Sequence, residues 1–579
     1  MPSQATSETL RVWPGWIVVV LQWIATFGVG AVMSATMVHF LSITIGPGLG
    51  LLLLLLWWTR TSHASRGDKI AVAVALPVAI FVAFLAADRS AKMAVYTHGI
   101  PLACLAFVAA ATLMAAWNDA RRRSVLVAVV VVAAAGWTLV RSEGVDGDMD
   151  EAFAWRWAPT AEERLLAADD TQSARPVATA ADTFTTPAWP GFRGADRDGV
   201  VATAPIATDW QATPPIELWR RPIGPGWGSF AVAGDLLFTQ EQRGDEEAVS
   251  AYHRATGEPV WRHREPVRFW EAMAGPGPRA TPTFADGRLY ALGATGLLNA
   301  LDAADGSPIW RRDVATDLAA PLPDWGFSAS PLVVDGLVVI HVPGAAADRE
   351  LAAYDALTGE PRWFAPAAGQ SYVSPHLGTI DGVRQILIAT SAGATSVAPA
   401  DGAVLWRHEW SAEGGARCVQ PAITPDGDVI IGTGFGVGIR RLDPTPQGDA
   451  WSLTERWTST RMKAYFNDFV LHDGSLYGFD NRILASLDLA TGERRWKGGR
   501  FGNGQMVLLA EQGLLLVISD RGEIALVEAS PDGFREVTRT PAIEGKTWNH
   551  PVIVDGILYV RNGQEMAAFE LPPAAPAAG

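Results

Sequence analysis

Aromatic, arginine and amide side chains recur in small groups between residues 227 and 550, and each group stands just before an apolar segment. Such side chains can hold a planar or sugar-like ligand by ring stacking and hydrogen bonds. The alternative is that the polar members cap strand ends and bind water. The groups are Trp227 and Ser229, Arg279 and Thr281, Trp325 and Ser328, Tyr372 and Ser374, Arg417 and Gln420, Asn467 and Asp468, Asn503 and Gln505, and Trp548, Asn549 and His550.

Other chemical motifs are weak. The chain has no HExxH, CxxC, P-loop or nucleophile elbow. GTGFGVG at 432–438 resembles a dinucleotide loop, but the following GIRRLDP has the pattern of a strand rather than a helix, which favours a turn within a sheet. DGDMD at 146–150 resembles a calcium loop, yet Glu151 stands where glycine is needed, so an acidic linker is the better interpretation.

The elements that would position these groups repeat along the chain. Each copy has an apolar strand, a DG-type turn, a second strand, and a segment of the type AxDxxTGExxW. Gly allows the tight turn before the last strand, and Trp fills the space between neighbouring units. The copies end 39 to 53 residues apart, the spacing of four-stranded propeller blades. They end at Trp261, Trp310, Trp363, Trp406 and Trp496 and, in looser copies, at Trp457 and Val537.

The two ends of this region predict how the propeller closes. Glu217–Ile223 is an outer strand without inner strands before it, whereas Asn549–Leu571 supplies three inner strands without an outer one. Together they complete one blade, and seven whole repeats bring the count to eight. We therefore expect an all-β eight-bladed propeller closed by pairing of its first and last strands.

The residues before the repeats predict a membrane domain. No charged residue lies between Trp13 and Trp58, a stretch long enough for two helices that cross roughly 30 Å of hydrocarbon, with a turn near Ser34–His39. Further apolar stretches bring the expected number of spans to about five. They are Ile70–Ala87, Ile100–Trp117 and Ser124–Val140.

Charge predicts the orientation. Arg60, Arg66 and Lys69 flank two spans and Arg121–Arg123 flank two others, so both clusters should face the cytoplasm, together with the amino terminus. Residues 1–140 contain 9 Lys/Arg and 4 Asp/Glu, whereas the remainder contains 37 and 57. An acidic exported domain argues against nucleic acid as a partner. The expected location is the inner membrane, multi-pass, with the propeller on the periplasmic side.

The TGExxW ends resemble the pyrroloquinoline-quinone (PQQ) type propeller repeat, shared by quinoprotein dehydrogenases and the propeller subunit of the outer-membrane barrel assembly machinery. WPGFRGADRDG at 189–199 looks like the start of a bacterial subfamily of PQQ-binding-like propellers, and RATPT, WGFSASPLVV and SYVSP also look like that subfamily. The repeat is specific for the fold and much less so for chemistry, since one scaffold serves both enzymes and binding proteins.

A multi-span anchor before a propeller also resembles the membrane-bound quinoprotein glucose dehydrogenases. That resemblance implies PQQ with Ca²⁺, but the family's calcium ligands and catalytic Asp cannot be placed on matching positions of this sequence. From their position before the innermost strands alone, a dehydrogenase would have Asp468 as candidate catalytic base, Asn467 as candidate calcium ligand, and Trp227, Trp325 or Trp548 as candidate stacking platforms. The vicinal cysteine pair of soluble alcohol dehydrogenases has no counterpart, since Cys104 lies in a span and Cys418 is alone. The glucose enzymes lack that pair too, but their blades carry long insertions, whereas these blades are nearly minimal.

We expect an anchor at 1–140, a linker at 141–188 with one short helix around 161–168, the propeller at 189–573, and a disordered tail at 574–579. The favoured role is a binding or scaffold module for a protein or small ligand. The alternative is a PQQ-dependent sugar or alcohol dehydrogenase that passes electrons to membrane quinone, and a third possibility is carbohydrate recognition. Expected partners are the membrane, envelope proteins, or a small sugar-like or quinone ligand.

Overall fold

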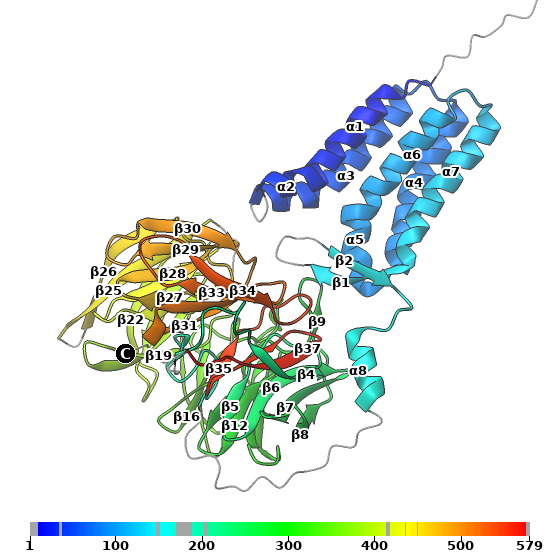
Figure 1. Ribbon diagram of the computed structural model, residues 1–579. Coiled ribbons are helices and arrows are strands. Elements are labelled where there is room, and N and C mark those ends of the chain that lie inside the picture. The colour runs from blue at the N-terminus through cyan, green and yellow to red at the C-terminus, as the bar shows by residue number, and fades with distance from the viewer. Residues whose placement is uncertain are drawn as a thin grey trace, which may run out of the picture. The chain divides into compact units, whose positions relative to one another are not determined.

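The computed structural model describes residues 10–33, 37–145, 151–169, 188–201, 205–412, 417–434, 436–448 and 450–574. The turn expected near Ser34, the acidic residues Asp146–Asp150 and tail residues 575–579 lie outside these ranges. The chain forms two compact units, Met1–Ala158 with Ala272–Gly275, and Pro159–Glu271 with Pro276–Gly579. The first contains the long helices, blue to cyan in Figure 1, and the second contains the propeller.

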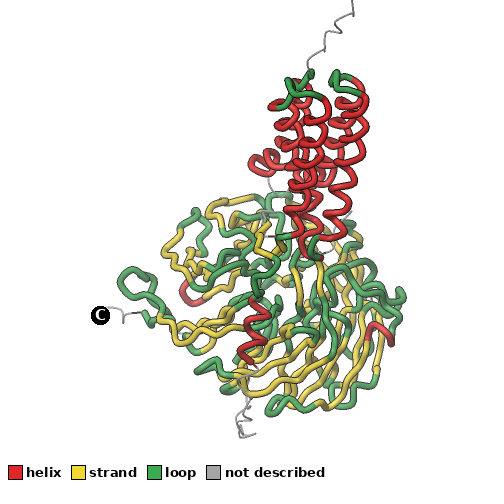
Figure 2. Tube along the Cα trace, turned by 90° about the vertical axis from the view of Figure 1, so that its right-hand side faces the viewer, coloured by secondary structure: helices red, strands yellow, loops and turns green. Residues whose placement is uncertain are grey.

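The helical unit contains four stretches, within the described residues, that are long and apolar enough to cross a membrane: Trp13–Val32, Val38–Arg60, Arg66–Ala86 and Arg89–Leu113. A fifth helix of 17 residues coincides with the last expected span. The long helices run side by side (Figure 2). The elements are α1 (Trp13–Trp23), η1 (Ile24–Gly28), α2 (Val29–Met33), α3 (Met37–Arg60), α4 (Arg66–Ala86), η2 (Arg89–Ala91), α5 (Lys92–Ala94), η3 (Val95–Gly99), α6 (Ile100–Leu113), α7 (Asp119–Ala135) and η4 (Gly136–Thr138).

A buried carboxylate joins α4 to α7. Asp68, in the first turn of α4, is fully buried and accepts hydrogen bonds from Arg122 Nε at 2.9 Å and from Arg123 Nε at 3.1 Å. The cap of α4 is Ser65, whose hydroxyl accepts from the Asp68 N–H. Two of the three consecutive arginines that predicted the orientation are thus also engaged in helix packing.

The residues expected to form a linker contain an antiparallel hairpin of β1 (Val140–Val145) and β2 (Glu151–Trp155). The expected short helix is α8 (Ala161–Asp169). Thr160 and Glu163 form a capping box at its start, each side chain accepting from the other's backbone N–H at 3.0 and 2.6 Å. Arg268 of the propeller unit binds Glu162 through two 2.8 Å hydrogen bonds, which fixes α8 to that unit.

The second unit is the expected eight-bladed propeller. Each blade is a sheet of four antiparallel strands in sequence order, and the last blade pairs β37 with β4. The predicted closure is confirmed, with Ala568 opposite Trp219. GTGFGVG joins the adjacent strands β24 and β25, as predicted for a turn within a sheet.

The first four blades are β5 (Ala231–Ala233), β6 (Leu236–Arg243), β7 (Glu246–His253) and β8 (Pro259–Glu265); β11 (Thr283–Ala285), β12 (Arg288–Leu292), β13 (Leu297–Asp302) and β14 (Pro308–Asp313); β15 (Leu332–Val334), β16 (Leu337–His341), β17 (Leu351–Asp355) and β18 (Pro361–Ala365); β19 (His376–Ile380), β20 (Val383–Thr390), β21 (Gly393–Val397) and β22 (Val404–Glu409).

The remaining strands complete the ring. They are β23 (Ala422–Ile423), β24 (Val429–Thr433), β25 (Gly438–Gln447) and β26 (Ala450–Ser459); β27 (Val470–His472), β28 (Ser475–Asp480), β29 (Ile483–Asp488) and β30 (Arg494–Arg500); β31 (Gln505–Leu509), β32 (Leu514–Ile518), β33 (Glu523–Glu528) and β34 (Glu536–Pro541); β35 (Val552–Val554), β36 (Ile557–Arg561), β37 (Glu565–Glu570) and β4 (Ile216–Pro222). Shorter elements are β3 (Val200–Val201), which adds to the seventh blade in parallel, β9 (Trp270–Glu271), β10 (Gly275–Pro276), α9 (Val314–Asp317) and η6 (Ala510–Gln512).

The repeated Gly and Trp of TGExxW act together across blades. Gly306 has φ +74°, and a Cβ there would lie 2.3 Å from the ring of Trp261 in the preceding blade; Gly402 stands in the same relation to Trp363, at 2.5 Å. Trp261 Nε1 donates to the Ala303 carbonyl at 3.1 Å, and Trp363 Nε1 to the Pro399 carbonyl at 3.0 Å. Glycine therefore makes the turn and also leaves the flat surface on which the neighbouring indole packs.

Candidate functional site

Eight residues, each two positions before an innermost strand, lie at the inner ends of the blades, and we call them the inner ring: Ser229, Thr281, Ser330, Ser374, Gln420, Asp468, Asn503 and His550. Backbone N–H groups donate to the side chain of the next blade along. The N–H of Ser229 donates to the Thr281 hydroxyl at 2.8 Å, that of Thr281 to the Ser330 hydroxyl at 2.9 Å, and that of Ser330 to the Ser374 hydroxyl at 2.8 Å. The N–H of Ser374 donates to the Gln420 side-chain carbonyl at 3.1 Å, and that of Gln420 to the Asp468 carboxylate at 2.6 Å.

The inner ring thus joins blades, in line with the strand-capping interpretation of these residues. Ser229 Oγ also donates to the His550 carbonyl at 2.6 Å, from the first blade to the last. The sequence placed Ser328 in this set, but its hydroxyl donates locally to the Trp325 carbonyl at 3.3 Å, and Ser330 holds the equivalent position. Counting two residues back from each innermost strand would have found Ser330.

Residues 189–201, which we call the axial segment, connect blades on different sides of the propeller. Trp189 pairs with Val232 of the first blade, and β3 pairs with β31 of the seventh. The buried Arg197 guanidinium donates to the Ser330 carbonyl at 3.2 Å and the Pro375 carbonyl at 3.0 Å, in the third and fourth blades. To reach these partners, the segment must cross the inner ends of the blades. Burial lowers the pKa of Arg197 to about 9.

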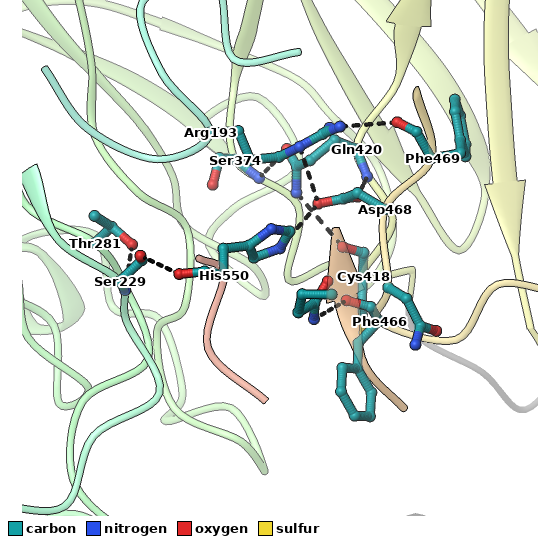
Figure 3. Close-up of polar contacts among 12 residues, drawn as sticks. Arg193, Ser229, Thr281, Ser374, Cys418, Gln420, Phe466, Asp468, Phe469 and His550 are labelled. Carbon is teal, nitrogen blue, oxygen red and sulfur yellow. Dashed lines mark hydrogen bonds and ion pairs between the residues drawn. The ribbon is translucent and has the colours of Figure 1, made fainter. Parts of the chain in front are cut away.

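Asp468 is buried among polar groups of the axial segment and the ring (Figure 3). Arg193 Nε and His550 Nε2 lie 3.7 and 3.4 Å from its Oδ2, and the Gln420 N–H donates to its Oδ1. Burial alone would raise the pKa of Asp468, but Arg193 and the hydrogen bonds from His550 and Gln420 hold it below its ordinary value. A carboxylate with a lowered pKa and an arginine partner is poorly matched to general-base catalysis near neutral pH.

Other predicted polar residues also serve the scaffold. Asn467 Nδ2 donates to the Gly504 carbonyl at 2.9 Å and its Oδ1 accepts from Tyr465 N, while Asn549 Nδ2 donates to the Gly228 carbonyl at 2.7 Å. Arg417 is fully buried, donates to the Trp410 carbonyl at 2.7 Å and packs 4.5 Å from that ring; burial lowers its pKa to about 10. The Asn503 N–H donates to Asp520 at 3.0 Å.

The predicted aromatic residues, by contrast, are only partly buried and contact one another. Ring centroids are 5.0 Å apart for Trp227 and Trp548, and 4.9 Å for Trp325 and Tyr372. Phe466 and Tyr465 join these pairs, so the six rings form one continuous aromatic patch: Trp227, Trp548, Phe466, Tyr465, Trp325 and Tyr372, with successive centroids 4.9 to 6.3 Å apart.

One cation contacts this aromatic patch. Lys546 Nζ lies 4.6 Å from the centroid of Trp548 and 5.2 Å from that of Trp227. Arg279, predicted as a ligand residue, packs 4.6 Å from Phe269 and forms an ion pair with Glu271 at 2.8 Å. Lys546, Tyr465 and Phe466 were not among the residues predicted from the sequence. Phe466 could have been found by spacing, since it stands two residues before Asp468, as Trp227 stands before Ser229.

The resemblance implies PQQ with Ca²⁺, and the inner-ring residues do not fit that pair. Both oxygens of Asp468 are engaged within the chain, Asn467 bonds backbone groups through both ends of its amide, and the axial segment crosses the same region. Within the described residues, no three His, Cys, Asp or Glu side chains stand close enough together to hold a metal ion. We therefore derive no reaction step through this cofactor.

The propeller region matches known proteins in sequence. The family described as "Outer membrane protein assembly factor BamB" matches residues 245–498, less than half of the chain. The propeller is BamB-like. The outer membrane protein assembly factor BamB of Shewanella oneidensis is 26% identical over 377 residues, covering 61% of this chain and 88% of that protein. The resemblance to the PQQ-type repeat is thereby confirmed for the BamB-like propeller.

The chain is also similar to solved structures. The quinohemoprotein alcohol dehydrogenase of Comamonas testosteroni has a TM-score of 0.50 at 11% identity, covering 72% of this chain and 86% of that chain. BamB from Moraxella catarrhalis has a TM-score of 0.43 at 14% identity, covering 59% and 93% of the two chains. At 11% identity the dehydrogenase likeness shows a shared architecture and says nothing about chemistry.

Proposed function

We propose that this protein is a membrane-anchored, extracytoplasmic scaffold whose propeller binds a partner protein of the cell envelope. The aromatic patch is the observation that carries the proposal. Its six partly exposed rings are of the types enriched in protein interfaces, where Trp and Tyr are frequent hot spots of binding energy. The relative from Shewanella oneidensis, described as an outer membrane protein assembly factor, supports a protein as the partner.

The charge distribution supports the proposed orientation. Arg60 and Arg66 stand at the adjoining ends of α3 and α4, and Arg121 stands in the first turn of α7. Basic residues next to short loops remain on the cytoplasmic side. The carboxyl-terminal end of α7 then faces outward, and the propeller, which follows it in the chain, is extracytoplasmic.

The dehydrogenase remains the second candidate because an anchor of several helices precedes the propeller. The residues of the inner ring argue against it, since Asp468, the one candidate base in the predicted set, is paired with Arg193 and hydrogen bonded to the Gln420 N–H. We accordingly assign binding to the aromatic patch and structural closure to the inner ring.

Photo-crosslinking tests this proposal. A benzophenone amino acid replaces Tyr465 in the aromatic patch or, as control, Leu357, which is 59% exposed next to a turn of the third blade. In intact cells we expect the label at position 465 to form one discrete adduct with an envelope protein. Trp548→Ala should reduce the yield of this adduct, and the label at position 357 should not form it. Equal adducts from both positions, or none from 465, would contradict the assignment.

A further inference from the structure

The β1–β2 hairpin exposes large aromatic side chains directly after the last helix of the anchor. Trp155 is 55% exposed, Trp157 67% and Phe153 40%, and Leu139, just before β1, is 47% exposed. The two indoles stack on each other with centroids 5.1 Å apart and planes inclined by 8°. An apolar group of this size on a short hairpin indicates a surface that is covered in the working protein.

Contacts within the helical unit fix this hairpin to the ends of the membrane helices. Arg156 Nη1 donates to the carbonyl of Ala86, the last residue of α4, at 3.1 Å, and the Ser142 N–H donates to Ser90 Oγ in η2 at 3.0 Å. Phe153 packs edge to face with Trp137, at 5.6 Å. The hairpin therefore lies where α4 ends and the next span begins.

In the proposed membrane-spanning arrangement, on which this inference rests, this position is the boundary between hydrocarbon and water. Trp is enriched there because its ring is apolar and its N–H is polar, so that each finds its preferred surroundings in the headgroup region. Two basic residues belong to the same end of the helical unit. Arg156, between the two indoles in the chain, is about half exposed and lies 4.0 Å from Asp88, and Arg89 begins the next candidate span. Guanidinium groups at this depth can bind lipid phosphates.

We infer that the β1–β2 hairpin lies on the bilayer surface, with Trp155 and Trp157 inserted among the phospholipid headgroups. The occupant of the exposed aromatic surface is thus the same membrane that the helices span in this proposal, because the hairpin is hydrogen bonded to the last residue of α4, next to Phe81 and Leu85, which are 61% and 60% exposed. The chain that leaves the anchor is fixed to the bilayer as far as Trp157, and the hairpin acts as an interfacial anchor in addition to the spans.

Spin-label accessibility tests this inference in the full chain, reconstituted in phosphatidylethanolamine–phosphatidylglycerol vesicles. Cys104 and Cys418 are first replaced by Ala, and single labels are placed by Trp157→Cys, by Val78→Cys on α4, which is 52% exposed, and by Leu357→Cys on the propeller. We expect the label at 157 to be accessible to oxygen and poorly accessible to a water-soluble nickel chelate. The label at 78, in a candidate span, should show the same pattern, whereas the label at 357 should be readily accessible to the nickel chelate.

Two outcomes would overturn the inference. High nickel accessibility at 157 would mean that the indoles are in water, and low accessibility to both relaxers would mean that protein covers them. Should labelling at 157 disturb the hairpin, quenching of tryptophan fluorescence by brominated lipids gives a second measurement. The Trp155→Phe, Trp157→Phe variant should lose part of the lipid-dependent quenching, and unchanged quenching would also refute the proposal.

Discussion

The inner ring and the aromatic patch alternate in sequence yet differ in role. Ser229 and His550 are buried and bond neighbouring blades, whereas Trp227 and Trp548, two residues earlier in each case, are partly exposed and contact each other. Both layers come from the same segment before an innermost strand. The comparison teaches that chemically promising residues at a propeller axis can belong to two layers, one that closes the scaffold and one that is available for binding.

The largest expected effect is on the scaffold layer. Arg193→Met removes the cation that faces Asp468 and leaves a buried carboxylate without its main partner, so the free energy of unfolding should fall by about 3–5 kcal/mol. Denaturant unfolding of the detergent-solubilised chain measures this. Arg384→Ala is the matched control, because its 2.8 Å pair with Asp335 is about half exposed on both sides and should contribute less than about 1 kcal/mol. Equal losses of unfolding free energy in the two variants would contradict the structural role that we assign to the buried pair.

A somewhat smaller, pH-dependent effect is expected at Asp468. Asp468→Asn weakens the charge-assisted hydrogen bonds and should lower the free energy of unfolding by about 2–3 kcal/mol at pH 7. Because the folded pKa of Asp468 lies below its unfolded value, its contribution is complete above about pH 4 and is lost as pH falls through the folded pKa. The deficit should therefore stay constant down to about pH 4 and shrink as the pH falls below that value. A deficit that grows toward low pH would show a raised folded pKa instead.

The neutral part of the ring should respond less. Ser330→Ala leaves the Thr281 N–H without the hydroxyl that accepts from it at 2.9 Å, at a cost of about 1–2 kcal/mol. Ser328→Ala, two residues earlier and outside the ring, is the control and should cost less. The same unfolding measurement compares the two variants, and a larger loss for Ser328→Ala would show that the ring is not the closing element.

The smallest effect on stability belongs to the aromatic patch. Lys546→Ala removes a cation next to Trp548 and Trp227 and should lower the free energy of unfolding by no more than about 1 kcal/mol. Its effect should instead appear as weaker partner crosslinking from position 465. Normal crosslinking together with a large loss of stability would reverse the roles that we assign to the two layers.

Much of the fold was predictable because its signals are periodic. The repeated TGExxW segments predicted the blades. The unmatched strands within Glu217–Ile223 and Asn549–Leu571 predicted how the ring closes, which the structure shows as the pairing of β4 with β37. The packing of the Trp261 ring against Gly306 was not predictable from a turn rule, because these residues are 45 positions apart in the chain and belong to different blades.

The candidate site was predictable only in part. Its residues were found, but their division into two layers depends on the axial segment, whose sequence WPGFRGADRDG has no periodicity that would place Arg193 next to Asp468. The β1–β2 hairpin was missed for a related reason. Its acidic, glycine-containing sequence has the composition of a linker, and the pairing of Val140 with Trp155 spans residues that carry no strand pattern.

The most direct test of the central claim is titration of the purified, detergent-solubilised chain with PQQ and Ca²⁺, followed by quinone absorbance and by dye reduction with a panel of sugars and alcohols. Because the axial segment and the inner ring bond one another across the blades, we predict neither saturable binding nor turnover. Binding of one PQQ per chain, with turnover that Asp468→Asn abolishes, would contradict the scaffold assignment and make the inner ring an active site.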